Sequence, residues 1–304
     1  ASDAIDKLYF RSLVDEKVDI NRADLAITVG YDDDERVITV SDNGLGMTKD
    51  ELDKNLGTIA HSDSFEFKAE NAEGDAAADV DIIGQFGVGF YSAFMVADHI
   101  TVVTKKFGED QAHRWESDGA DGYTITPCEK ADAGTDIIMH IKEDAEEENY
   151  SEFLQEYTLR NLIKKYSDYI RWPIRMEITK SRKKEDSPED KPEYESYKEE
   201  ETLNSMVPLW QRKKSDVTRA EYDKLYQEKF SDFTAPQSVI TVSAEGQVSY
   251  KALLYIPSRP PFDYYSADYE RGLQLYSAGV MIMDKCQDLI GDHFGFVKGV
   301  VDSP

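Results

Sequence analysis

The chain has 304 residues, of which 40% are hydrophobic, so it is long enough to form two domains with apolar cores. Its formal net charge of −26, from 61 acidic and 35 basic residues, argues against a nucleic-acid partner, because such a partner requires a basic surface. No apolar run has transmembrane length and no signal peptide is evident, so we expect no membrane partner. The two cysteines, Cys128 and Cys286, are far apart in the sequence, so we expect no disulfide and a reducing, cytoplasmic location.

The first elements predicted are a helix and two strands. Apolar residues recur with a helical period from Ile5 to Val14, and the segments Leu25–Gly30 and Val37–Ser41 have the β-branched, alternating pattern of strands. The second strand ends at Asp42, and a carboxylate that is buried at the end of a strand requires a hydrogen-bond donor.

The residues after this strand suggest what that donor is. Asp42 precedes Gly44, Gly46 and Met47. The two glycines permit close backbone approach, the methionine is an adaptable apolar wall, and the exocyclic amine of adenine is a suitable donor. The alternative is a β-turn in which Asp42 caps the helix predicted at Lys49–Leu56.

A second glycine cluster lies about forty residues further on. Its glycines have the spacing G-x-x-G-x-G and open a helix predicted at Val88–Val96, and the cluster reads Gly84-Gln85-Phe86-Gly87-Val88-Gly89-Phe90. Free N–H groups at the start of a helix bind anions, so this cluster is a candidate phosphate site. It matches neither a Walker loop nor a dinucleotide-binding turn, and a helix packed closely on a sheet is the alternative. The polar segment 56–83 between the clusters is either a lid or a disordered insertion.

Strands and helices alternate irregularly through the rest of the first domain, which predicts an α+β fold. A long amphipathic helix is expected at Glu152–Ile170, before Pro173. Further strands are expected at Ile100–Lys105, Gly122–Thr126, Thr135–Ile141 and Ile174–Thr179.

The charged, proline-containing segment 181–201 predicts a linker between domains at 1–180 and 202–304. The second domain is expected to contain strands at Val239–Val242, Tyr250–Ile256 and Leu273–Met283, and helices at Val217–Phe230 and Leu289–Val297. Four aromatic residues are candidates for an exposed binding patch, although core packing suits most of them; they are Trp210, which we expect to be the most exposed, Phe262, Tyr264 and Tyr265.

Several motifs, in order along nearly the whole chain, resemble the ninety-kilodalton heat-shock protein chaperones, and particularly their bacterial members. They include Asp42-Asn43-Gly44-Leu45-Gly46-Met47-Thr48, Asn55-Leu56-Gly57-Thr58-Ile59-Ala60, the second glycine cluster, Trp115-Glu116-Ser117, Gly134-Thr135 and Phe296-Val297-Lys298-Gly299-Val300-Val301-Asp302-Ser303. The resemblance implies a two-layer α/β sandwich under a mobile lid, with the ATP site of DNA gyrase, histidine kinases and mismatch-repair ATPases, followed by the start of a middle domain.

The same resemblance implies roles for individual residues. Asp42 would bind the adenine amine with the help of Thr135 and a water, Asn55 would reach the sugar and phosphates, and Asp3 would support the pocket. The nucleotide-binding set, for ATP or ADP with Mg²⁺, would be Asp3, Asp42, Gly46, Met47, Asn55, His61, Ser62, Gly84, Gln85, Phe86, Gly87, Val88, Gly89, Phe90 and Thr135.

The chain departs from the family pattern near the γ-phosphate. His61 stands where a lysine is frequent and Asp63 where a glycine is common, so we expect a weaker γ-phosphate contact or altered lid closure. The family's general base and magnesium-binding asparagine would precede Ala1, and its arginine would follow Pro304. We therefore expect no catalytic residue within the chain and poor hydrolysis by the chain alone.

The resemblance implies an ATP-dependent molecular chaperone of the stress response, an ATPase that couples lid closure to the folding of client proteins. Co-chaperones and a homodimer of the full-length parent are also implied. Two alternatives remain: a histidine-kinase-like phosphotransferase, and a holding chaperone that works without nucleotide.

Overall fold

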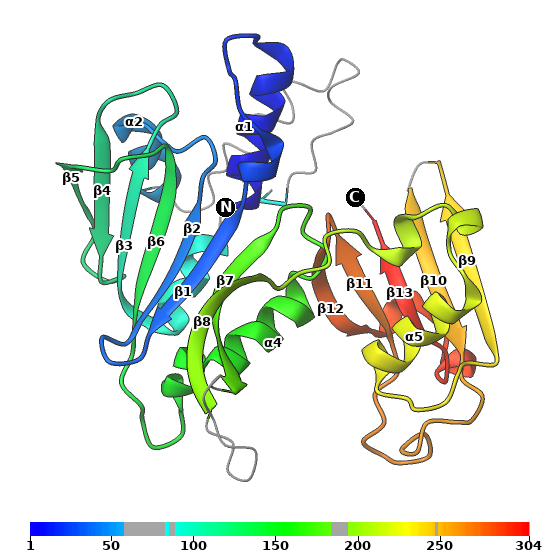
Figure 1. Ribbon diagram of the computed structural model, residues 1–304. Helices are drawn as coiled ribbons and strands as arrows, with labels where there is room; N and C mark the ends of the chain where they lie inside the picture. The colour runs from blue at the N-terminus through cyan, green and yellow to red at the C-terminus, as the bar shows by residue number, and fades with distance from the viewer. Residues whose placement is uncertain (58–82, 85–88, 184–193, 247–248, 304) are drawn as a thin grey trace. The chain divides into compact units, whose positions relative to one another are not determined.

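The computed structural model describes residues 1–57, 83–84, 89–183, 194–246 and 249–303, and these form two compact units (Figure 1). The first unit comprises Ala1–Lys164 and Trp172–Asn204, and the second comprises Lys165–Arg171 and Ser205–Pro304. The chain therefore passes between the units more than once, and we describe each unit by itself.

An eight-stranded sheet forms the first unit, in the order β5-β4-β3-β6-β2-β1-β7-β8. Neighbouring strands are antiparallel except β1 and β7, which are parallel. The strands are β1 (Ile27–Asp32), β2 (Val37–Asp42), β3 (Ala97–Lys105), β4 (Ala112–Ser117), β5 (Thr124–Cys128), β6 (Gly134–Ile141), β7 (Ile174–Lys183) and β8 (Tyr194–Thr202).

Alternating side chains give this sheet one buried face. Ile100 and Val102 of β3, and Trp115 of β4, are almost fully buried in one cluster with Leu52 of a covering helix. The helices of the unit are α1 (Ser2–Val14), α2 (Lys49–Gly57) and α4 (Glu156–Tyr166), with 3₁₀ turns η1 (Arg22–Asp24), η3 (Gly89–Met95) and η4 (Tyr150–Leu154). A mixed sheet covered by helices confirms the predicted α+β class and matches a two-layer sandwich.

The second unit contains a five-stranded sheet in the order β12-β11-β13-β10-β9. Its strands are β9 (Ser238–Ala244), β10 (Tyr250–Ile256), β11 (Leu273–Ser277), β12 (Val280–Cys286) and β13 (Lys298–Asp302). Helix α5 (Arg219–Phe230) begins at a capping box formed by Thr218 and Glu221. The remaining elements are 3₁₀ turns η5 (Leu209–Gln211), η6 (Lys214–Asp216), η7 (Gln287–Leu289) and η8 (Asp292–Phe294).

Every strand expected from the sequence is present, but several elements differ in kind. The region of the predicted helix Val88–Val96 forms the 3₁₀ turn η3 where it is described, and Glu152–Ile170 divides into η4 and α4. The predicted strand Leu273–Met283 is a hairpin, because the chain reverses at Ala278 and Gly279, both of which have positive φ. The predicted helix Leu289–Val297 is wrong, since only short 3₁₀ turns occur there.

The described parts of the charged segment expected to be a linker, 181–183 and 194–201, take part in the sheet. Strand β7 continues to Lys183 and pairs with β8 from Arg175↔Thr202 to Lys183↔Tyr194. Ion pairs cross this strand pair, directly between Arg182 and Glu195, with Nε and Oε1 2.6 Å apart, and diagonally between Lys180 and Glu199, with Nζ and Oε2 2.9 Å apart. Strand β7 has an apolar face, since Ile174, Met176 and Ile178 are buried, and the cross-strand ion pairs add to its pairing with β8. The domain limits 1–180 and 202–304 stay a prediction.

Trp210 was the wrong choice for the most exposed aromatic residue. It is 7% exposed and packs against Tyr169 and Tyr276. Its indole N–H donates to Asp302 Oδ2 at 2.8 Å, which satisfies the polar edge of the ring inside the core. Phe262 and Tyr265 are exposed, as expected for a surface patch.

Both cysteines are free, Cys128 in the first unit and Cys286 in the second. Among the helices of the described residues, none combines the length and the apolar character needed to cross a membrane.

Candidate functional site

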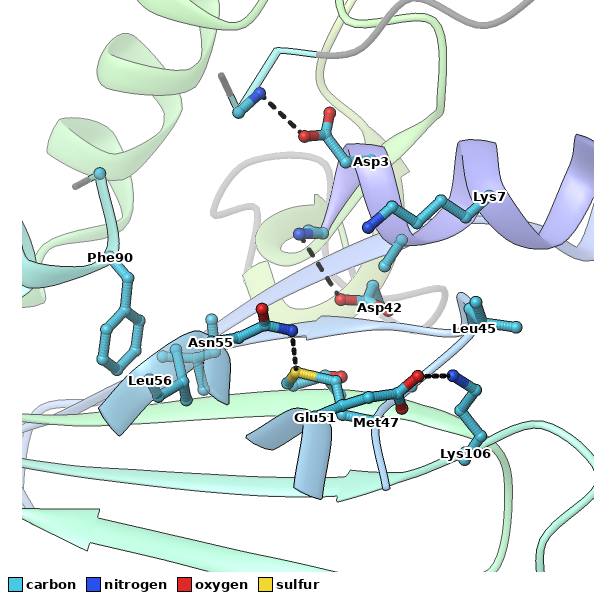
Figure 2. A pocket seen from close by; sticks show the side chains of 17 residues that line it. Asp3, Lys7, Asp42, Leu45, Met47, Glu51, Asn55, Leu56, Phe90 and Lys106 are labelled. Atoms are coloured by element: carbon cyan, nitrogen blue, oxygen red, sulfur yellow. Dashed lines mark hydrogen bonds and ion pairs between the residues drawn. The ribbon is translucent and has the colours of Figure 1, made fainter. Parts of the chain in front are cut away.

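A cavity of about 340 Å³ lies in the first unit, between α1, α2 and the ends of β2, β3 and β6. Figure 2 shows side chains from these elements pointing into it. Its lining comprises Ala1, Asp3, Ala4, Lys7, Asp42, Leu45, Gly46, Met47, Glu51, Asn55, Leu56, Gly84, Gly89, Phe90, Lys106, Thr135 and Ile137.

Strand register produces a polar row at the floor of this cavity. Asp42 of β2 pairs with Thr135 of β6, and Thr135 pairs with Thr104 of β3. The two threonine hydroxyls are 2.9 Å apart, and all three residues are buried. A carboxylate and two hydroxyls are thus presented side by side on adjacent strands.

The Asp42 carboxylate lies at the cavity wall and is hydrogen-bonded to the turn that follows β2. Its Oδ1 accepts the Gly44 N–H at 3.0 Å. Burial raises the pKa of the carboxyl, and this outweighs the lowering effect of the Gly44 N–H. Asp42 does not cap α2, because Thr48 and Glu51 form the capping box there, so the turn alternative is wrong on that point.

The glycines after Asp42 are required by close backbone approach. A Cβ on Gly46, which has φ +63°, would lie 1.9 Å from the Lys105 carbonyl oxygen. A Cβ on Gly44 would lie 2.5 Å from the Ala4 carbonyl carbon of α1. Any side chain at either position would push α1 or β3 away from the turn and distort the cavity.

Helix α2 contributes one wall through residues at helical spacing. Glu51 and Asn55 lie one helical turn apart on α2, and Met47, in the turn just before the helix, lines the cavity with them. Asn55 Nδ2 lies 3.8 Å from the sulfur of Met47, and the Glu51 carboxylate is paired with Lys106 (Figure 2).

Helix α1 holds the start of the second glycine cluster. The Asp3 carboxylate accepts the N–H of Ile83 at 2.9 Å and that of Gly84 at 2.8 Å. The Asp3 carboxylate therefore fixes the start of the loop, and its role in nucleotide binding stays a prediction. Lys7, one helical turn later, also reaches the cavity (Figure 2).

The structure brings most of the predicted site residues together around this cavity: Asp3, Asp42, Gly46, Met47, Asn55, Gly84, Gly89, Phe90 and Thr135. His61, Ser62, Gln85, Phe86, Gly87 and Val88 lie outside the described residues. Their roles in binding stay predictions.

Sequence reasoning missed four polar residues at or beside the cavity. Lys7 and Glu51 were detectable in principle, because each lies one helical turn from a predicted site residue, Asp3 and Asn55 respectively. Thr104 and Lys106 carry no local signal, since only the pairing of β3 with β6 brings them to the site.

Comparison with known proteins gives matches along the whole chain. The family model described as "Hsp90 protein" matches residues 152–202 and 183–304, and the model described as "Histidine kinase-, DNA gyrase B-, and HSP90-like ATPase" matches residues 12–140. The second match contains most of the described cavity residues, from Asp42 to Thr135.

Individual relatives are similar over the full length of this chain. A chaperone protein HtpG of Clostridium botulinum (strain Langeland) is 54% identical over 303 residues, which is 100% of this chain and 47% of that protein. A chaperone protein HtpG of Clostridium perfringens (strain ATCC 13124) is 55% identical over 303 residues, again 100% of this chain and 48% of that protein. The chain thus spans about half the length of the curated relatives it matches.

Proposed function

Because this chain belongs to the Hsp90 protein family, we propose that it binds ATP and ADP as the nucleotide-binding part of an ATP-dependent molecular chaperone. One observation carries the proposal: a buried carboxylate, Asp42, faces a cavity of about 340 Å³ inside the region that matches the ATPase family model. That volume lies within the usual range for small-molecule sites.

The residues around the cavity suit an adenine ring. The buried carboxylate of Asp42 is an acceptor for the exocyclic amine, and the Thr135 and Thr104 hydroxyls beside it can hold a water against the ring nitrogens. Met47 and Ile137 supply apolar surface for the faces of the base. A guanine would present a carbonyl oxygen to Asp42 in place of the amine, so two acceptors would oppose each other and the site would favour adenine.

The phosphates would extend toward the second glycine cluster. Gly84, Gly89 and Phe90 line that part of the cavity. The N–H groups of Ile83 and Gly84 donate to Asp3 and fix the start of the loop, so the phosphates would bind N–H groups later in the cluster. Backbone N–H groups of glycine loops are suitable donors to phosphate oxygens.

Mg²⁺ would be carried mainly by the nucleotide. Within the described residues there is no group of three histidine, cysteine or acidic side chains able to hold a metal ion. Mg²⁺ commonly keeps several waters and binds through substrate phosphates with few protein ligands, so the cavity is compatible with it as the partner of ATP.

At the level of the whole protein, we propose an ATPase cycle in which nucleotide-driven lid closure changes the contacts with client proteins. A homodimer, co-chaperones and a cytoplasmic location belong to the same proposal. ATP would bind the closed state more tightly than the open state, and this difference in affinity would drive lid closure. His61 and Asp63 would weaken the γ-phosphate contact relative to members with lysine and glycine there.

The phosphotransferase alternative requires an acceptor histidine on a helix. The histidines among the described residues are His99, His113 and His140 on strands and His293 in a 3₁₀ turn, which does not favour it. Buried Trp210 weakens the nucleotide-independent holding alternative, although Phe262 and Tyr265 remain exposed.

Thermal shift with nucleotides tests the proposal. ADP with Mg²⁺ should raise the melting temperature, GDP at equal concentration should not, and Asp42→Asn should abolish the ADP effect. Equal shifts from ADP and GDP would refute adenine recognition by Asp42.

A further inference from the structure

The cavity wall contains an ion pair to which the proposed nucleotide contacts assign no role. Glu51 of α2 and Lys106, which follows β3, form it, and both line the cavity (Figure 2). The two side chains are 34% and 17% exposed respectively. A pair so shielded from water is screened less than a surface pair.

Glu51 is fixed on both sides. Its Oε1 accepts from Lys106, and its Oε2 accepts the Thr48 N–H at 2.8 Å as part of the capping box of α2. Burial acts to raise the pKa of Glu51, but the hydrogen bonds from Lys106 and Thr48 lower it overall. The carboxylate is therefore ionised at neutral pH and joins the start of α2 to the end of β3.

The segment between these elements is the turn Gly44–Thr48, which carries the base-binding wall. Two hydrogen bonds already connect it to β3 and the residues that follow β3: the Met47 N–H donates to Thr104 Oγ1 at 3.0 Å, and the Phe107 N–H donates to the Leu45 carbonyl at 2.8 Å. The Glu51–Lys106 pair is a third connection, and it is the one made by two charged groups.

We propose that the Glu51–Lys106 pair is a positioning element that holds Met47 and the adjoining turn against β3, and thereby sets the affinity of the base side of the pocket. This rests on the proposed function, because the base is the adenine of the nucleotide. Lys106 acts through Glu51 and the turn, not as a ligand of the phosphates.

The position of the pair supports a role at the base rather than at the phosphates. Glu51 lies one helical turn before Asn55 on α2, toward Met47 and the turn. In Figure 2, Lys106 lies with Leu45, on the opposite side of Asp42 from Phe90. The glycine loop near Phe90 is the phosphate side.

The first test needs no nucleotide. Amide hydrogen exchange over 44–52 is measured in Glu51→Gln, Lys106→Met, the double variant and a control, Lys105→Met. The control removes an equal charge from the neighbouring residue, whose Nζ donates to the Ala131 carbonyl at 3.0 Å, outside the cavity. We expect exchange to be faster by about threefold or more in both single variants, with no further increase in the double variant. Exchange equal to the control would overturn the proposal.

The second test is ADP affinity by calorimetry on the same variants. Gln at position 51 keeps an acceptor for the Thr48 N–H, so only the charge pair is lost. We expect both single variants and the double variant to bind about three- to tenfold more weakly, and Lys106→Arg to recover the affinity. If Lys106→Met weakens ADP while Glu51→Gln does not, Lys106 is a direct phosphate ligand and the proposal is wrong. Absence of ADP binding by the unmodified chain would refute the proposed function. The hydrogen-exchange measurement would still test whether the ion pair holds the turn against β3.

Discussion

Removing one hydroxyl from the floor of the cavity should destabilise the first unit measurably. Thr104 is fully buried, its hydroxyl accepts the Met47 N–H at 3.0 Å, and it lies 2.9 Å from the Thr135 hydroxyl. Thr104→Val keeps the shape of the side chain but leaves the Met47 N–H and the Thr135 hydroxyl without this partner. A buried donor left unsatisfied costs about 1–3 kcal/mol, so we expect a loss of about 2 kcal/mol.

Urea unfolding followed by circular dichroism measures this loss, with Thr104→Ser as the matched control. Serine keeps the hydroxyl and removes one methyl group, which should cost about 1 kcal/mol or less. An unchanged denaturant slope would indicate that the difference arises in the folded state. The reasoning is refuted if Thr104→Val is as stable as the unmodified chain, or if Thr104→Ser loses as much as Thr104→Val.

Three further predictions concern buried groups. The raised pKa of Asp42 means that folding disfavours its charged form, so the stability of the unmodified chain should fall relative to Asp42→Asn as the pH rises above 3.8, the ordinary pKa of the group. A stability difference that stays constant with pH in urea unfolding would contradict this. Tyr255 has a buried hydroxyl without a hydrogen-bond partner among the described residues, so Tyr255→Phe should leave the stability unchanged or raise it. Tyr226→Phe removes a 2.6 Å hydrogen bond to Asp232 and should lower the stability by about 1 kcal/mol. Thermal unfolding of the two variants measures both changes. All three tryptophans are less than a tenth exposed, so acrylamide should quench native fluorescence weakly, and quenching equal to that in urea would disprove their burial.

Local patterns predicted the parts of the structure that depend on local physics. The alternation in Val37–Ser41 predicts β2, and the position of Asp42 at its end follows directly. Gly44 and Gly46 predicted a close approach of the backbone, and in the structure they lie against α1 and β3 respectively. The predicted helix start at Lys49 was also right, because Thr48 and Glu51 form a capping box there.

The remaining features depend on contacts between distant segments. Strand β8 has polar residues on both faces, so it shows no periodicity, and only pairing with β7 defines it. Trp210 comes after Pro208-Leu209 and looks accessible in the sequence, but Asp302, 92 residues away, accepts from its indole N–H. Lys106 reaches the cavity only because β3 lies beside β6. None of these contacts can be predicted from a short window of sequence.

Calorimetric titration of ADP with Mg²⁺ into the unmodified chain and Asp42→Asn tests the central claim most directly. The Asn side chain can still accept the Gly44 N–H, so near-ultraviolet circular dichroism should show an intact fold in the variant. We predict saturable binding by the unmodified chain and a loss of at least about tenfold in Asp42→Asn. Equal affinity in the two proteins, or no binding by the unmodified chain, would contradict the account.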